Sequence, residues 1–141
     1  MDQRLSPYIT FNGNCAEAMR FYESVLDGTL RLLKLADSPA AEHLPNTDGN
    51  LIMHACLELP GGRVMASDHM EGCGGTFEGI KGISLAITYP TVEEATRRFN
   101  ALSEGGKITM ALQQTFWAET FGVAVDRYGI TWLVNGGEMQ G

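Results

Sequence analysis

The chain has few cysteines, few basic residues and no long apolar run. Three cysteines are present, and no two of them have the Cys-x-x-Cys spacing of a zinc knuckle or a redox pair. An odd, small number also argues against a disulfide framework. No stretch is apolar and long enough for a signal peptide or a transmembrane helix. We therefore expect a reduced, cytoplasmic protein without a membrane partner.

Positive charge is scarce as well. Ten Lys and Arg stand against 17 Asp and Glu, for a formal net charge of −7. Such a surface repels phosphate backbones, so a nucleic-acid partner is not expected. Arg97 and Arg98 form the densest basic cluster along the chain, and no basic patch for an acidic ligand is predicted. The hydrophobic fraction of 44% and the charged fraction of 19% are those of a globular protein.

Two predicted helices repeat each other 77 residues apart. The first follows a candidate N-cap at Asn14 and ends at Gly28, and the second follows Thr91 and ends at Gly105. Each has a glutamate three residues after its cap and an apolar stripe at helical spacing. Either two ordinary helices share these features by chance, or the chain contains an internal duplication. The flanking segments favour the duplication.

One β-type run precedes each predicted helix and three follow it. These runs are residues 8–11, 29–35, 51–59 and 63–67 in the first half, and 83–89, 107–113, 119–125 and 130–134 in the second. The first half also carries an insertion at 36–50, which is predicted to be a mobile loop. The pattern predicts a βαβββ module at 1–70, a glycine-rich joint at 71–80 and a second module at 81–141. We expect one α+β domain of cupped mixed sheets with helices outside and a small-molecule cavity inside.

Several short motifs carry a family resemblance. They are AMRFY (18–22), LDG (26–28), DRYGITW (126–132), PYITFNGN (7–14), MHA (53–55) and ASD (66–68). With the duplicated module, the chain resembles the vicinal oxygen chelate superfamily of glyoxalases, bleomycin-resistance proteins and dioxygenases, and within it the PhnB-like subgroup. The resemblance covers nearly the whole chain and implies the fold more specifically than the activity, because this fold hosts many chemistries.

The resemblance implies a divalent metal held by His, Glu or Gln on the first and last strands of each half. The matching positions here are Pro7, Ala66, Ile83 and Leu133, whose side chains offer no lone pair to a metal. We therefore predict that the usual metal site has been lost, and we expect no cofactor.

His54 is the candidate catalytic residue, in mid-strand between Met53 and Ala55. It is either part of the sheet wall or a general base in the cavity. Asp68 is the expected catalytic partner if an adjacent strand brings it near, since Glu58 on the same strand is roughly 13 Å away. His43 is expected to be solvated in the loop, His69 to make a surface hydrogen bond and Cys56 to pack in the core.

Aromatic residues gather in the second half. Trp117, Phe121 and Trp132, together with Met53, are the candidate ligand-binding residues, although ordinary packing would also explain them. We therefore expect a metal-independent protein that binds a small apolar or aromatic molecule. The alternative is a lyase or dioxygenase-type enzyme that uses a displaced divalent metal or His54 as base. A module without a ligand is a third possibility.

We also predict a homodimer, because the resemblance implies cups completed across a two-fold interface and such dimers are the commonest assembly. Sedimentation velocity at micromolar concentration should give a particle of about twice the 15.3 kDa chain mass. A single monomeric species would contradict this prediction.

Overall fold

The computed structural model describes residues 3–70 and 76–139. The chain divides into two compact units, Met1–Gly79 and Ile80–Gly141. Cys73 and the first part of the expected glycine-rich joint lie outside the described residues. In the described part of the chain, no helix has the length and apolar character needed to cross a membrane.

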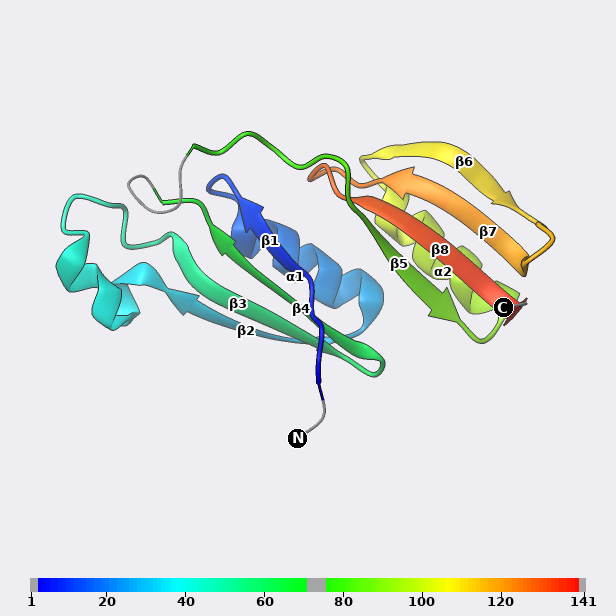
Figure 1. Cartoon of the computed structure of the whole chain (residues 1–141), viewed down its shortest axis with the longest axis horizontal. Coiled ribbons are helices and arrows are strands. Elements are labelled where there is room, and N and C mark those ends of the chain that lie inside the picture. The colour runs from blue at the N-terminus through cyan, green and yellow to red at the C-terminus, as the bar shows by residue number, and fades with distance from the viewer. Residues whose placement is uncertain (1–2, 71–75, 140–141) are drawn as a thin grey trace. The chain divides into compact units, whose positions relative to one another are not determined.

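Each unit contains one helix and one four-stranded mixed sheet (Figure 1). Unit 1 consists of β1 (Tyr8–Phe11), α1 (Cys15–Leu26), β2 (Thr29–Lys34), β3 (Ile52–Leu59) and β4 (Gly62–Asp68). Unit 2 consists of β5 (Ser84–Tyr89), α2 (Val92–Ser103), β6 (Lys107–Gln113), β7 (Ala118–Val125) and β8 (Thr131–Met139). The strand orders β1-β4-β3-β2 and β5-β8-β7-β6 are the same. In each sheet the first strand pairs parallel to the last, and the other pairs are antiparallel. The predicted α+β fold of two βαβββ modules is confirmed.

The core of each unit lies between its helix and one face of its sheet. Figure 1 shows α1 and α2 each crossing their own sheet. In unit 1 the strands contribute alternate residues to this core, and the helix contributes a matching stripe. The buried residues include Ile9, Phe11, Ala55, Leu57, Val64 and Ala66 from the sheet and Ala18, Met19 and Tyr22 from α1. The residues between them on each strand therefore face away from the helix.

The start of α1 is stabilised differently from the prediction. Asn14 makes no side-chain capping bond. Instead the Oδ1 atom of Asp68, at the end of β4, accepts the backbone N–H of Gly13 at 3.0 Å and of Cys15 at 2.9 Å. The Oδ2 atom of Asp68 accepts the N–H of Ile52 at 2.9 Å. A buried carboxylate from a distant strand thus replaces the local cap.

Cys15 begins α1 and is fully buried. Burial, and secondly the negative charge of Asp68, raise the pKa of the Cys15 thiol to about 12. The thiol is therefore neutral at physiological pH and is a packing residue, not a nucleophile.

The end of α1 also differs from the prediction. Asp27, rather than Gly28, adopts the left-handed backbone conformation that ends the helix, with φ of 58°. Gly28 is needed for a close approach, because a Cβ atom there would lie 2.7 Å from the backbone oxygen of Glu58. In unit 2 the predicted Gly105 does adopt a positive φ, of 77°.

The start of α2 confirms its predicted cap. Thr91 accepts the N–H of Glu94 through its Oγ1 atom at 3.1 Å. The residue of β8 that corresponds to Asp68 is Gly136, because Asp68 pairs with Phe11 at the end of β1 and Gly136 with Tyr89 at the end of β5. A Cβ atom at Gly136 would collide with the Ala95 side chain and lie 3.0 Å from the Thr91 oxygen. Unit 2 therefore brings its helix directly against the strand.

Replacement of Asp68 by Asn should destabilise the protein by about 2–4 kcal/mol. An amide cannot accept all three hydrogen bonds, because its NH2 group would face a backbone N–H, and two donors would then oppose each other. Asp48→Asn is the matched control, since the Asp48 carboxylate accepts the exposed N–H of Asn50, and it should change stability by less than about 0.5 kcal/mol. Urea unfolding measures both. Equal urea midpoints for the two variants would show that the Asp68 carboxylate does not stabilise the contact between the end of β4 and the start of α1.

Candidate functional site

A pocket of about 460 Å³ lies within unit 1, on the face of the sheet turned away from α1. Strands β1, β3 and β4 form its floor, and the segment that follows β2 forms its side. Its lining residues are Tyr8, Thr10, Ala40, His43, Leu44, Met53, Ser67, Asp68, His69 and Met70. The lining combines apolar side chains, one aromatic ring and a few hydroxyl and imidazole groups, which is the usual composition of a small-molecule site.

The strands position the pocket floor through their alternation. Tyr8 and Thr10 lie on the exposed side of β1, while Ile9 and Phe11 between them are buried. Thr10 pairs directly with Ser67 of β4, so their side chains share this face.

An irregularity in β3 brings Met53 to the pocket. Leu33 of β2 pairs with His54 and Lys34 with Ile52, so the register skips Met53. Ile52 is buried and bound to Asp68, whereas Met53 lines the pocket. Of the predicted ligand-binding residues, Met53 is the one that lies in this pocket.

The side wall was predicted to be a mobile loop. It contains two short 3₁₀ helices, η1 (Leu35–Asp37) and η2 (Pro39–His43). Its base is closed by backbone bonds from Leu35 to the oxygen of Leu51 and from Ala36 to that of Gly49. His43 is exposed to solvent, as expected, and it also lines the pocket. Ser38 followed by Pro39 was the available signal for a helical turn.

His54 and Asp68 are not brought together as the expected catalytic pair. The Nδ1 atom of His54 lies 3.4 Å from the hydroxyl oxygen of Tyr8, and the two rings are 5.9 Å apart between centroids. The Asp68 carboxylate accepts the three backbone bonds described above. The neighbour of His54 in the structure is therefore Tyr8, which also lines the pocket, and Asp68 supports the pocket through the backbone.

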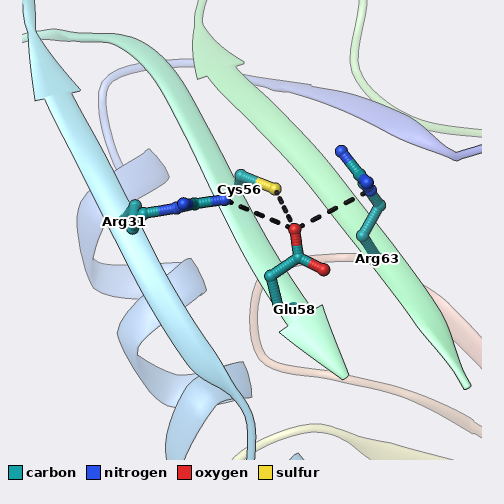
Figure 2. Close-up of polar contacts among 4 residues, drawn as sticks. All are labelled: Arg31, Cys56, Glu58 and Arg63. Atoms are coloured by element: carbon teal, nitrogen blue, oxygen red, sulfur yellow. Dashed lines mark hydrogen bonds and ion pairs between the residues drawn. The ribbon is translucent and has the colours of Figure 1, made fainter. Parts of the chain in front are cut away.

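A charged cluster lies on the same sheet face, although no basic patch was predicted. One carboxylate oxygen of Glu58 lies 3.4 Å from a guanidinium nitrogen of Arg31 and 3.8 Å from one of Arg63 (Figure 2). The thiol sulfur of Cys56 lies 3.6 Å from the same oxygen. The three charged residues come from β2, β3 and β4, so only the pairing of the strands unites them.

The aromatic residues of unit 2 form a smaller group than predicted. Trp117 packs edge-on against Phe121 at 5.1 Å and against Phe116 at 4.8 Å between ring centroids. Trp132 pairs with Ala124, three residues from Phe121 on β7 and therefore on the opposite face. Its indole N–H donates to the buried carboxylate of Asp126 at 2.8 Å. The structure thus places Trp132 in the helix-side core and separates it from the other two predicted ligand-binding residues.

The residues at the positions that the family resemblance matches to metal ligands do not fit a metal. Pro7, Ile83 and Leu133 carry no donor atom in their side chains, and Ala66 is fully buried in the core of unit 1. Within residues 3–70 and 76–139, no group of three or more His, Cys, Asp or Glu side chains could hold a metal ion.

Comparison with known proteins identifies related sequences over almost the full chain. The sequence model of a family described as 3-demethylubiquinone-9 3-methyltransferase matches residues 3–135. Protein YjdN of Escherichia coli K12 is 34% identical over 144 aligned residues, which cover 93% of each chain. The crystal structure of protein PA1353 from Pseudomonas aeruginosa is 41% identical, with a TM-score of 0.86 over 97% of this chain and 99% of that one.

More distant structures have the same fold. A protein from Bacillus cereus, described as a putative 3-demethylubiquinone-9 3-methyltransferase and PhnB protein, is 26% identical, with a TM-score of 0.74 over 96% of this chain and all of that one. A glyoxalase/bleomycin-resistance/dioxygenase domain from Frankia is 16% identical with a TM-score of 0.65, covers 98% of this chain and 93% of that one, and shows the fold alone. The chain therefore belongs to the 3-demethylubiquinone-9 3-methyltransferase family, a PhnB-like family with the glyoxalase/bleomycin-resistance/dioxygenase fold.

Proposed function

We propose that the protein binds a small apolar or aromatic molecule in the pocket of unit 1, without a metal at the positions that the fold family uses. The observation that carries this proposal is the pocket itself, whose volume of about 460 Å³ suits a ligand of one or two rings. The methyl transfer in the family's description belongs to the relatives, and the proposal depends on the chemistry of the pocket lining instead.

The lining supports a ligand with a flat apolar body. Met53, Met70 and Leu44 offer flexible apolar contacts, and methionine sulfur packs favourably against aromatic rings. Tyr8 is half exposed, so its ring is available for stacking. Thr10 and Ser67 add hydroxyl groups that would orient the ligand without setting a strong preference for charge.

The pocket is favoured over the aromatic group of unit 2 as the ligand site. Phe116 is 86% exposed, and Trp132 belongs to the helix-side core. A ligand surface at Trp117 and Phe121 of unit 2 stays a prediction, and this proposal does not require it.

Filling the pocket should remove ligand binding. In Thr10→Trp the indole would occupy the pocket floor, and the equivalent exposed residue on β5, Thr88, gives the matched control Thr88→Trp. One- and two-ring aromatic compounds should raise the melting temperature of the wild type and of Thr88→Trp, and should have little effect on Thr10→Trp. Saturation at about 100 times Kd corresponds to about 2.7 kcal/mol of stabilisation. The proposal fails if no compound stabilises the wild type, or if both variants respond alike.

A second candidate function is a lyase-type reaction with His54 as base; the dioxygenase form would need a displaced metal. The specific observation in its favour is the contact between His54 and Tyr8 at the edge of the pocket, because a phenol beside an imidazole can orient it for proton transfer. A substrate would present an acidic C–H bond next to a carbonyl group.

For this candidate, deuterium exchange of α-oxo acids in D2O, followed by proton NMR, measures proton abstraction directly. The wild type should accelerate exchange, and His54→Ala should lose at least about 100-fold, as expected for removal of a general base. His43→Ala, in the pocket wall, is the control that should retain exchange. A fully active His54→Ala with intact circular dichroism would exclude His54 as the base.

A further inference from the structure

The cluster of Arg31, Glu58 and Arg63 contains more donor groups than its carboxylate can use. Each guanidinium presents five N–H donors, whereas a single Glu58 oxygen faces both. The distances of 3.4 and 3.8 Å exceed the 2.7–2.9 Å typical of a strong charge-assisted bond. The side chains of Arg31 and Arg63 are 72% and 34% exposed, so an incoming anion can reach them.

This cluster makes one face of an acidic unit positive. Residues 1–79 contain more Asp and Glu than Lys and Arg. On the strands of unit 1, however, Asp68 is buried against α1, which leaves Glu58 as the acidic side chain beside two arginines. An anion that approaches this face therefore meets local attraction within a repulsive surface.

The arginines also share a sheet face with the pocket. Arg31 pairs with Cys56, Cys56 with Met65, and Met65 with Tyr8 of the pocket floor, in one row across the four strands. Neighbouring strands are about 4.8 Å apart, so Tyr8 and Cys56 are separated by about 10 Å. Figure 2 shows the Arg31 guanidinium directed towards Glu58 and the Nε atom of Arg63 facing the same Glu58 oxygen, on the side of the sheet away from α1.

We propose that Arg31 and Arg63 bind the acidic group, a carboxylate or a phosphate, of the ligand whose apolar part occupies the pocket. The inference depends on the proposed function and narrows its ligand class to elongated apolar or aromatic acids. Glu58 holds the two guanidinium groups in place in the free protein, and the acidic group of the ligand competes with it. Cys56 lies beside the Glu58 oxygen and limits the depth of the site.

Unit 2 supplies a built-in comparison. Glu94 on α2 likewise faces two arginines, with its Oε2 atom 3.8 Å from Arg97 and 3.2 Å from Arg98. Arg97 is 69% exposed, close to the value for Arg31. This trio has the composition of the proposed site and one arginine of similar exposure. It lies along one helix at i, i+3 and i, i+4 spacing and belongs to the other unit.

The test uses phenylalkanoic acids with chains of two to six carbons, each paired with its neutral amide, on the full chain. Isothermal titration should show the best acid binding about tenfold more tightly than its amide. Arg31→Gln and Arg63→Gln should each reduce this preference to about one while retaining amide binding, and Arg97→Gln should leave it unchanged. Phenylalkyl phosphates, measured in the same way, identify which acidic group is preferred.

Glu58→Gln separates ligand binding from a purely structural ion-pair network. It removes the competing carboxylate and should raise acid affinity several-fold, whereas a structural network would show no gain. If acids and amides bind the wild type equally and neither binds Thr10→Trp, the arginine site is overturned and the pocket proposal stands. Failure of both acids and amides to bind the wild type would overturn both proposals.

Discussion

Unit 1 depends on the three backbone hydrogen bonds accepted by the carboxylate of Asp68. A buried carboxylate is costly unless its oxygens are satisfied, and here the three bonds also fix two distant parts of the chain. The bonds to Gly13 and Cys15 set the start of α1, and the bond to Ile52 sets the start of β3. Because Ile52 is held on the core side, the residue after it is released from the pairing and Met53 lies in the pocket. The position of Met53 in the pocket is thus a consequence of how the opposite face of the sheet is held.

The two faces of the unit 1 sheet have different roles. One face is covered by α1 and carries the fully buried residues that provide most of the hydrophobic stabilisation. The other face combines hydroxyl, imidazole, thioether and guanidinium groups with few buried apolar residues. Substitutions there change surface chemistry at little cost in folding, which explains how one fold can serve many ligands.

Sequence periodicity was sufficient to predict the elements and their duplication, because the apolar stripe of each helix and the alternation of each strand are local patterns. It could not predict which strand residues become neighbours. Arg31 and Cys56 meet across 25 positions of chain, and Asp68 reaches Gly13 across 55; no local pattern encodes such partners. The face occupied by Trp132 was missed for a related reason, since alternation along β8 says nothing of its phase relative to β7. The 3₁₀ turns of residues 35–43 were missed because Pro, Ser and Asp are equally common in irregular loops.

The contrast between Asp68 and Gly136 also bears on how the two halves have diverged. At this equivalent position unit 1 has Asp68, whose carboxylate accepts hydrogen bonds from the three-residue connection and the first residue of α1. Unit 2 has Gly136, and the absence of a side chain there leaves room for α2, which is capped by Thr91. Neither solution works with the other's surroundings. An aspartate at 136 would collide with Ala95, and a glycine at 68 would leave three backbone N–H groups, two of them buried, without the acceptor they now have. The halves therefore share an architecture but have become non-interchangeable parts. A chimera that combines elements of both halves would have to keep each helix with the last strand of the same half, because these two elements have changed as a pair.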